Sequence, residues 1–283
     1  MSRLIINADD FGLTAGVNRA IVELYQAGVL TSTTLMARAA ATGGAIGLVQ
    51  SFPLLGVGCH IVLVDGEPAL SPAKIPSLIH DSSGCFRSSL GQFLVRLFTG
   101  RISAAEIEAE AAAQIEVIQK TGLRLTHVDT HKHTHMFPAV LRPVLRAARA
   151  AGIRAVRNPF EPVWAVRATA GASWARAAEV NLLRKMQAKC RKIIAEEGFV
   201  TTDGTIAVVG TGVLNAETLR RLLRQLPEGT WELVTHPGHN DSDLDRVRTR
   251  LRASREIEMK ALEAIREFPE IELISYAELG RAQ

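Results

Sequence analysis

The sequence predicts an α/β protein, and within that class a single (β/α) barrel over residues 1–283, TIM-like and either regular or distorted. Short apolar runs alternate with helical stretches along almost the whole chain, as in parallel strands joined through helices. A length of 283 residues with 47% hydrophobic residues suits one barrel and its core. Polar residues with metal-binding or acid–base chemistry follow several expected strands, which predicts a metal site at the C-terminal rim of the strands.

The first element is a strand over Leu4–Ala8, an apolar run typical of a buried strand. Thr14 is a typical N-cap for the helix that follows, and Gly28 is a typical residue just past a helix end. Ser103 and Glu106 have the spacing of a capping box, which predicts that another helix begins there. The same reasoning predicts strands near residues 31–36, 56–63, 124–130, 153–157, 205–209, 231–235 and 271–274, and helices over 103–121, 138–151, 174–197, 215–226 and 243–268.

Residues 64–102 are rich in proline, glycine and serine, which predicts an inserted loop region instead of a regular strand–helix unit. Its apolar side chains have two interpretations: they form a lid over a lipid tail, or they pack against the barrel wall. These side chains are Ile75, Leu78, Ile79, Phe86, Phe93, Leu94, Leu97 and Phe98. No composition change or repeat divides the chain, so we expect one domain.

The composition excludes several classes of protein. With 22% charged and 47% hydrophobic residues, the chain is neither disordered nor fibrous. The net charge is only +4, and aromatic residues make up 5%, so no nucleic-acid partner is expected. A weak attraction of the basic helix 243–268 to an anionic membrane surface stays open, as does a homodimer. The arginines of the C-terminal part interleave with acids at spacings that suit solvated helix faces; they are Arg220, Arg221, Arg224, Arg246, Arg248, Arg250, Arg252 and Arg255.

Two further features concern the cellular compartment. No uninterrupted run of about 18 apolar residues is present, and acidic residues occur before a signal-peptide core could form. We therefore expect a cytoplasmic protein, with membrane association left open. Cys59, Cys85 and Cys190 are odd in number and lack CxxC spacing, which predicts reduced thiols.

Polar residues gather where the expected strands end. Asp9 and Asp10 follow the first strand, and His60, Arg157 and His236 lie at the ends of later ones. Because the carboxyl ends of parallel strands share one rim, these distant residues are expected to come together. Four of the eight histidines fall within nine positions of the segment 126–137: His127, His131, His133 and His135, with Asp129 among them.

Imidazole and carboxylate ligands together favour zinc, with magnesium or another first-row ion as alternatives. A catalytic site usually offers one such ion three protein ligands and an open position, and Asp10, His60 and His131 would make that set. Alternate histidines of the segment 126–137 would face one side of an extended chain, whereas His127 and His131 have a four-residue separation also seen in metal sites. Spacing alone does not decide which of them bind.

Successive side chains diverge at a strand end, so Asp10 could hold the metal while Asp9 accepts a proton from the attacking water. The alternative is that the two aspartates cap a turn. His236 precedes a proline, which favours extended geometry, and it could protonate a leaving group. Arg157 either orients a carboxylate or is a structural tether, and replacing it is expected to act more gently than loss of a base. The other candidates for binding or orienting substrate are His133 and Asp129.

Five ordered motifs resemble the YdjC family of carbohydrate deacetylases and extend over nearly the whole chain. They are LIINADDFGL at 4–13, LTSTT at 30–34, GVGCH at 56–60, THVDTH at 126–131 and THP at 235–237. Other segments are most similar to the hopanoid-biosynthesis-associated branch, HpnK: VLVDG at 62–66, AKIP at 73–76, VRNPFEP at 156–162 and CR at 190–191.

The resemblance implies a (β/α) barrel and a divalent metal held by Asp10, His60 and His131, with Asp9 in place of the family's base. The implied enzyme is a metal-dependent carbohydrate N-deacetylase, an amide hydrolase acting on a linear C–N bond. The branch implies the N-acetylglucosaminyl headgroup of a hopanoid glycolipid as substrate.

Two residues depart from the family pattern. Cys59 stands where a larger aliphatic residue is common, and Lys132 stands where relatives that act on chitin oligosaccharides have a further histidine. Substrate specificity therefore does not carry over from those relatives. The alternatives are deacetylation of free N-acetylated oligosaccharides, cleavage of a phosphoester or another amide, and glycolipid binding without turnover.

Overall fold

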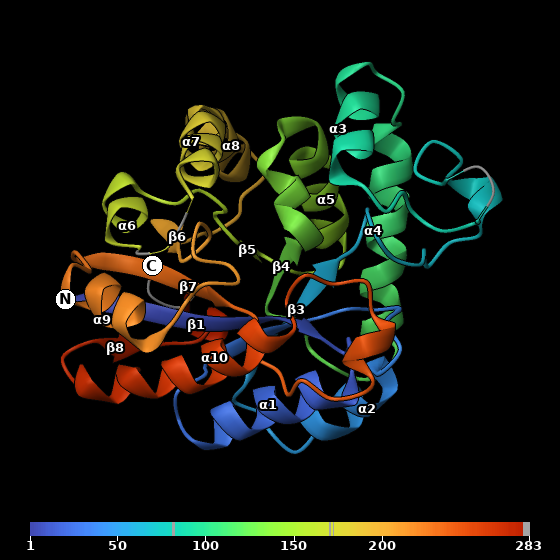
Figure 1. The fold of residues 1–283 in the computed structure, drawn as a ribbon. Coiled ribbons are helices and arrows are strands. Elements are labelled where there is room, and N and C mark those ends of the chain that lie inside the picture. Colours follow the sequence, from blue (N-terminus) through green and yellow to red (C-terminus); the bar gives the residue numbers. More distant parts are fainter. Residues whose placement is uncertain (81–82, 170, 172, 280–283) are drawn as a thin grey trace.

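The computed structural model describes residues 1–80, 83–169, 171 and 173–279. Its centre is a parallel sheet in the order β5-β4-β3-β2-β1-β7-β6, with β8 paired to β1 outside this path (Figure 1). The strands are β1 (Ser2–Phe11), β2 (Ser32–Leu35), β3 (Gly56–Ile61), β4 (His127–Thr130), β5 (Ala155–Val156), β6 (Gly204–Ile206), β7 (Gly229–Thr235) and β8 (Glu272–Leu273). The predicted α/β class and the predicted strand positions are confirmed.

The seven strands of this path curl into a partial barrel, so the expectation of a closed TIM-like barrel is wrong. The two ends of the path are β5 and β6, and no strand ladder within the described ranges joins them. The segments around them are joined instead by an isolated bridge between Ala155 and Val200 and by scattered hydrogen bonds, such as the one of 2.6 Å from the Thr205 hydroxyl to the Asn158 carbonyl. β5 and β6 each pair with one neighbouring strand, β4 and β7, and the path therefore stays open between them.

The long strand β1 organises the sheet. Its residues from Ser2 to Ala8 pair with β7, and residues from Asn7 onward pair with β2. The register shifts between Ala8 and Phe11, where Asp10 has a left-handed backbone with φ of 65°. Aspartate is one of the few residues that tolerate this conformation. The irregular end of β1 thus turns the Asp10 side chain away from the regular strand pattern.

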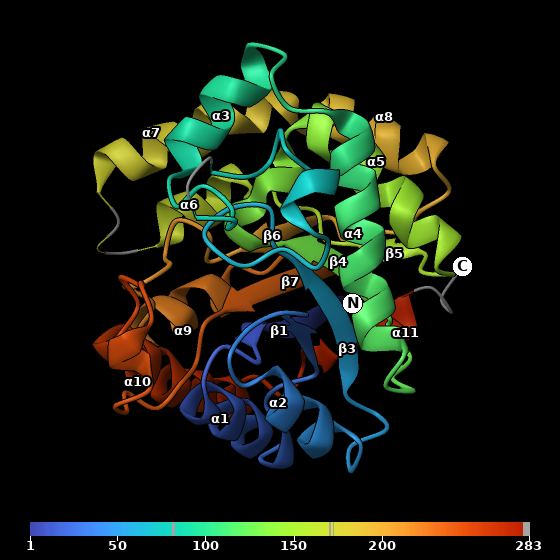
Figure 2. The same cartoon turned by 90° about the vertical axis from the view of Figure 1, so that its right-hand side faces the viewer.

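Helices cover both sides of the curled sheet (Figures 1 and 2), with α1, α2 and α10 on one side and α5, α7 and α8 on the other. The Thr14 hydroxyl accepts from Val17 N–H at 3.2 Å, which confirms the predicted N-cap of the first helix. The α-helices are α1 (Ala15–Gln26), α2 (Thr42–Val49), α3 (Leu90–Phe98), α4 (Ala104–Gln119), α5 (Pro138–Ala150), α6 (Val163–Ala168), α7 (Trp174–Leu183), α8 (Gln187–Glu196), α9 (Ala216–Arg224), α10 (Ala253–Ala261) and α11 (Tyr276–Leu279).

Two predicted helices are interrupted. The helix expected over 174–197 is divided by a 3-10 turn at Arg184–Met186. The helix expected over 243–268 consists of a 3-10 turn at Leu244–Arg246, then α10, and then a further 3-10 segment at Leu262–Glu267. Between the 3-10 turn and α10, the Thr249 hydroxyl accepts a hydrogen bond from Leu251 N–H at 3.0 Å. This side-chain bond takes the place of a backbone bond within a helix.

The insertion 64–102 contains a 3-10 turn at Pro72–Lys74 and helix α3; its residues 81 and 82 lie outside the described part of the chain. Its side chains mostly pack into the molecule, which supports the packing interpretation over a lid. Phe98 differs, because it is 66% exposed and its ring meets that of Phe137 edge to face. The buried side chains are Ile75, Leu78, Ile79, Phe86 and Phe93, and the partly buried ones are Leu94 and Leu97.

The start of α4 ties this insertion to the sheet. The Ser103 hydroxyl accepts from Glu106 N–H at 3.4 Å, which is one half of the predicted capping box. The Glu106 carboxylate does not complete the box, because it accepts from both the backbone N–H and the hydroxyl of Ser77 at 2.8 Å.

The three cysteines are free thiols, as predicted, and Cys59 and Cys190 are buried. Among the described residues, none of the helices combines the length and the apolar character needed to span a bilayer.

Glu161 supports the turn after β6 and is expected to make folding stability depend on pH. Its buried carboxylate accepts from Ala207 and Val209 N–H at 2.7 Å each. Burial raises the pKa of Glu161 from 4.5 to about 7. The folded state therefore holds this proton more tightly, and the resulting stability is present below about pH 4.5 and lost as pH rises through about 7.

We expect this loss to reach about 3 kcal/mol in the free energy of unfolding. Urea unfolding at pH 5 and pH 8 measures it, with Glu161→Gln as the variant in which this part of the pH dependence disappears. An identical pH dependence in both proteins would show that Glu161 does not titrate in this range.

Candidate metal centre

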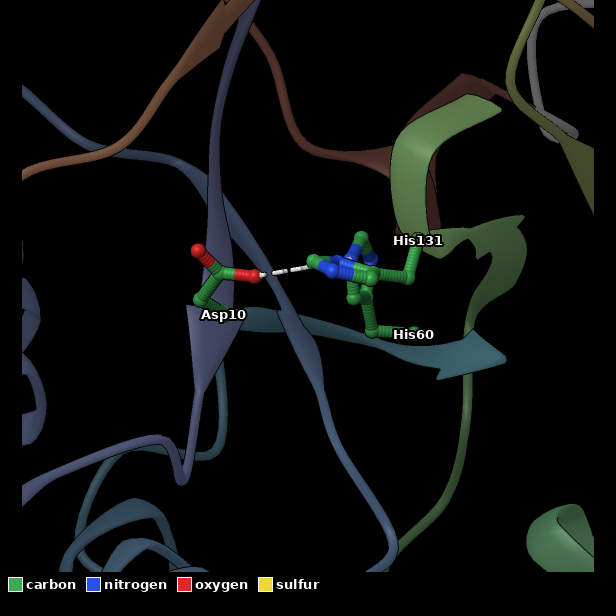
Figure 3. A group of neighbouring side chains, drawn as sticks. All are labelled: Asp10, His60 and His131. Atoms are coloured by element: carbon green, nitrogen blue, oxygen red, sulfur yellow. Dashed lines mark hydrogen bonds and ion pairs between the residues drawn. The ribbon is translucent and has the colours of Figure 1, made fainter. Parts of the chain in front are cut away.

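Three side chains from separate strands lie together at the carboxyl edge of the sheet (Figure 3): Asp10 from the end of β1, His60 from β3 and His131 just after β4. The Oδ1 atom of Asp10 lies 3.6 Å from His60 Nε2 and 3.5 Å from His131 Nδ1, and the two nitrogens are 3.2 Å apart. Ligands about 2.0–2.1 Å from a tetrahedral zinc ion are about 3.3 Å from one another. The donor set and its spacing therefore fit one divalent ion.

His60 is held with Nε2 directed at this point. Its other ring nitrogen, Nδ1, lies 2.8 Å from Asp129 Oδ1 and 3.2 Å from the Thr34 hydroxyl. A carboxylate on the far nitrogen is the usual means of orienting a metal-ligating imidazole. Burial lowers the pKa of His60, but the carboxylates led by Asp129 outweigh burial and raise it to about 9. Asp129 is completely buried, which places it behind the ligand.

Asp10 has only one carboxylate oxygen directed toward the two imidazoles. The other, Oδ2, accepts from Arg255 Nη2 at 2.6 Å. Burial alone would raise the pKa of Asp10, but the Arg255 guanidinium and the imidazoles hold it well below its usual range. Arg255 is 1% exposed, so the expectation that it lies on a solvated helix face is wrong. Its spacing matched that of its exposed neighbours, and no sequence signal distinguished it.

The segment after β4 is a kinked 3-10 turn and not an extended chain, so the expectation that its alternate histidines face one side is wrong. Lys132 and His133 have left-handed φ angles of 54° and 51°. Alternate residues therefore do not face one side, as they would in an extended chain. The His131 side chain keeps 21% exposure, so it forms the open side of the cluster.

A second group, Asp9, His60 and Asp129, also brings three ligand atoms within 4.8 Å of one another. Here the guanidinium of Arg157 already occupies the position of a cation. It bonds to Asp9 through Nη2 and Nη1, at 2.6 and 2.9 Å, and pairs with the Asp129 carboxylate. In the group around Asp10, Arg255 pairs with the outer oxygen Oδ2 and leaves Oδ1 facing the two imidazoles, so we assign the candidate metal site there.

Arg157 is completely buried among carboxylates. Besides Asp9 and Asp129, it bonds to Glu232 Oε1 through Nε at 2.8 Å and Nη2 at 2.7 Å. The Tyr276 hydroxyl donates to the other Glu232 oxygen at 2.5 Å. The arginine thus holds Asp9 in one orientation, as a tether and an orienting group at once. Sequence reasoning missed Glu232 and Tyr276, because an isolated glutamate in a strand and a tyrosine near the C-terminus carry no motif.

His236 lies on the other side of Asp9. Its Nε2 atom is 3.8 Å from Asp9 Oδ2, and its backbone N–H donates to Glu258 Oε2 at 2.7 Å. Burial lowers the pKa of His236, but the carboxylates of Glu258 and Asp9 outweigh burial and raise it. Glu258 is a further residue that sequence reasoning did not find.

The remaining histidines of the segment 126–137 differ from His131. His127 stacks on Tyr276 with ring centroids 3.8 Å apart, and burial lowers its pKa to about 3. His135 lies at 2.8 Å from the Thr130 hydroxyl, and burial lowers its pKa to about 4. Both are core residues. His133 has a buried Nδ1 atom without a hydrogen-bond partner among the described residues.

Comparison with known proteins is consistent with this arrangement. The YdjC-like protein family model matches residues 3–267. A carbohydrate deacetylase of Thermoanaerobacter pseudethanolicus is 29% identical over 262 residues, 93% of this chain and 91% of that protein. A carbohydrate deacetylase of Brevibacillus brevis is 42% identical over 52% of this chain and 55% of its own length. A chitooligosaccharide deacetylase of Salmonella schwarzengrund is 40% identical over 53% and 57%. The match thus spans little more than half the length of the last two relatives.

Solved structures show the same architecture. A crystal structure from Enterococcus faecalis, described as a candidate cellobiose-phosphate cleavage protein, superposes with a TM-score of 0.76 at 26% identity and covers 98% of both chains. A lactam utilization protein from Thermus thermophilus, at 15% identity and a TM-score of 0.54, covers 96% of this chain and 99% of that one, and shares the fold. The family model covers nearly the whole chain, and the protein therefore belongs to the YdjC-like family.

Proposed function

We propose that the protein is a metal-dependent carbohydrate N-deacetylase that hydrolyses the acetamide of an N-acetylated sugar. The observation that carries this proposal is the Asp10–His60–His131 cluster, whose ligand atoms fit one divalent ion. The names of the related carbohydrate and chitooligosaccharide deacetylases support the reaction and the substrate class.

Asp10, His60 and His131 would hold the ion, and two nitrogens with one oxygen favour zinc, with magnesium or another first-row ion as alternatives. A bound divalent ion supplies Lewis acidity that polarises the acetyl carbonyl and makes water a better acid at neutral pH. The exposed side of His131 leaves room for substrate to approach.

The chain's own groups move the protons. Water attacks the acetyl carbon, the C–N bond breaks, and acetate and the free amine leave. Asp9, held by Arg157, accepts the proton of the attacking water at a carboxylate oxygen. His236, 3.8 Å from Asp9, donates a proton from its ring to the departing nitrogen. The carboxylates of Glu258 and Asp9 raise the pKa of His236, which is the direction that suits a proton donor.

Replacing Asp9 by asparagine is expected to lower kcat by about 10²–10⁴-fold, because a general base contributes that much. Metal content should stay at one ion per chain, since Asp9 is not one of the assigned ligands. Acetate release and metal analysis of the same preparation measure both quantities. Turnover equal to that of the unchanged protein would refute the role of Asp9.

For the physiological substrate we propose the N-acetylglucosaminyl headgroup of a hopanoid glycolipid, met at a cytoplasmic membrane surface by peripheral contact. The similarity of residues 62–66, 73–76 and 156–162 to the HpnK branch supports this choice. The exposed Phe98 on α3 and Trp174 on α7, at 66% and 85%, would suit such a contact.

Free N-acetylated oligosaccharides are the second candidate substrate, favoured by the name of the Salmonella relative. Incubation with both classes, followed by mass spectrometry for loss of one acetyl group, separates them. Phosphorylated sugars scored for released phosphate test a phosphoesterase, and tight binding without product would indicate a glycolipid-binding protein.

A further inference from the structure

The structure also contains a small cavity of about 160 Å³, whose lining includes none of the candidate metal ligands. Its walls come from the segments that follow β1, β2 and β3, represented by Leu13, Met36 and Val62. Leu13 N–H donates to the Asp10 carbonyl at 3.0 Å, and Val62 is two residues beyond His60. The cavity therefore shares the carboxyl edge of the sheet with the candidate metal ligands.

The cavity combines an apolar wall with charged groups of both signs. Arg38 and Glu67 line it; both are exposed, and neither forms a hydrogen bond or salt bridge with any residue in the described ranges. Leu13, Met36 and Val62 supply the apolar contact. One guanidinium and one carboxylate suit a neutral ligand with many hydroxyl groups, since hydroxyls donate to carboxylates and accept from guanidinium. The apolar wall suits the C–H face of such a ligand.

The wall of this cavity is held firmly. Gln114 of α4 accepts from Val62 N–H at 2.8 Å and donates to the Val62 carbonyl at 2.7 Å. Asp65, also a cavity residue, pairs at 2.7 Å with Lys132, the residue after His131. Both partners of this pair have left-handed φ angles, 58° and 54°. The ion pair joins the cavity wall to the segment that carries a candidate metal ligand.

We propose that this cavity is a second subsite, which binds the neutral polyhydroxylated unit attached to the N-acetylated sugar. The inference rests on the proposed deacetylase function and deepens it by naming what lies next to the reacting sugar. The volume is below the roughly 300 Å³ at which drug-sized pockets begin, so it accepts one small unit. A second pyranose ring and a short linear polyol share this chemistry.

The first test compares a disaccharide with a monosaccharide. The measured quantity is kcat/KM for N,N′-diacetylchitobiose divided by kcat/KM for N-acetylglucosamine. We expect three variants to lower this ratio by about 10-fold: Arg38→Ala, Glu67→Ala and the cavity-filling Ala40→Trp. A change of about 10-fold is the effect of one hydrogen bond to a charged group. Arg224→Ala and Glu263→Ala, at exposed positions that do not line the cavity, serve as matched controls. An unchanged ratio in all three cavity variants overturns the proposal.

A second test needs no turnover, so failure of the deacetylase function does not obscure it. Calorimetric titration with cellobiose, a neutral disaccharide without an acetyl group, should show binding to the unchanged protein and at least 10-fold weaker binding to Ala40→Trp. Absence of cellobiose binding together with an unchanged kinetic ratio overturns the subsite. Absence of acetate release with preserved cellobiose binding overturns only the deacetylase function.

The source of the polyhydroxylated unit is decided by a third substrate, glyceryl N-acetylglucosaminide. If the glyceryl group raises kcat/KM over the free sugar as much as a second ring does, and Glu67→Ala removes the gain, the subsite accepts linear polyols. If only the second ring raises it, the subsite is specific for pyranose rings.

Discussion

The His131→Ala variant is expected to lose both its bound metal and its turnover. In the proposed ligand set His131 supplies one of three donor atoms, and its side chain is 21% exposed, so its removal costs little packing. Polarisation of a carbonyl by a divalent ion is worth several kcal/mol, so kcat/KM should fall by at least about 10³-fold. Metal analysis of the purified variant and acetate release from N,N′-diacetylchitobiose measure the two losses.

The matched control is His239→Ala, which removes a surface imidazole paired with Glu23. It should keep one ion per chain and full turnover. Added zinc should raise the melting temperature of the unchanged protein, because an ion that binds only the folded state stabilises it, whereas His131→Ala should show a much smaller rise. A His131→Ala protein that retains stoichiometric metal and turnover would show that the assigned ligand set is wrong.

Replacing Arg157 by leucine is expected to cause a large loss of folding stability in this chain. The substitution leaves the carboxylates of Asp9, Asp129 and Glu232 buried without their common cation. Breaking a buried ion pair from one side costs about 3–5 kcal/mol. The expectation from the sequence, that replacing Arg157 lowers turnover less than loss of the base does, concerns catalysis and stays a prediction. Urea unfolding of the purified variant measures the loss.

Arg157→Lys provides a variant that keeps the charge when leucine does not yield folded protein. It should lose part of the stability, because lysine cannot bond to Asp9 with two parallel donors. Arg221→Leu, which removes an exposed pair with Glu217, is the control and should change the free energy of unfolding by about 1 kcal/mol or less. Equal stability of the leucine variant and this control would contradict the central role of Arg157.

Much of the fold follows from local patterns. Thr14 caps its helix as predicted, because capping depends on hydrogen bonds within a few residues. The closed barrel and the continuous helix over 243–268 were wrong because both depend on contacts between distant segments. Closure requires a ladder between the two ends of the sheet, and only the structure shows that β5 and β6 form none with each other in the described part of the chain.

The residues of the candidate site also fall into those that the sequence predicted and those that only the structure revealed. Asp10, His60 and His131 were predicted because each carries metal-binding chemistry at the end of an expected strand. Arg255 and Glu258, both on α10, were not predicted, although one holds Asp10 and the other contacts His236. Both lie on a helix with many charged residues, and no local sequence pattern shows that these two side chains are buried.

By itself the sequence determined the α/β class, the order of its strands and helices, and the residues with metal-binding chemistry, because these depend on periodicity and residue type. Only the tertiary structure decided that the barrel stays open, that His127 and His135 belong to the core, and that Arg157 and Arg255 hold the two aspartates. Burial and partner distances depend on which distant segments meet, and in a chain of 283 residues that is settled by the packing of the whole sheet and its helices.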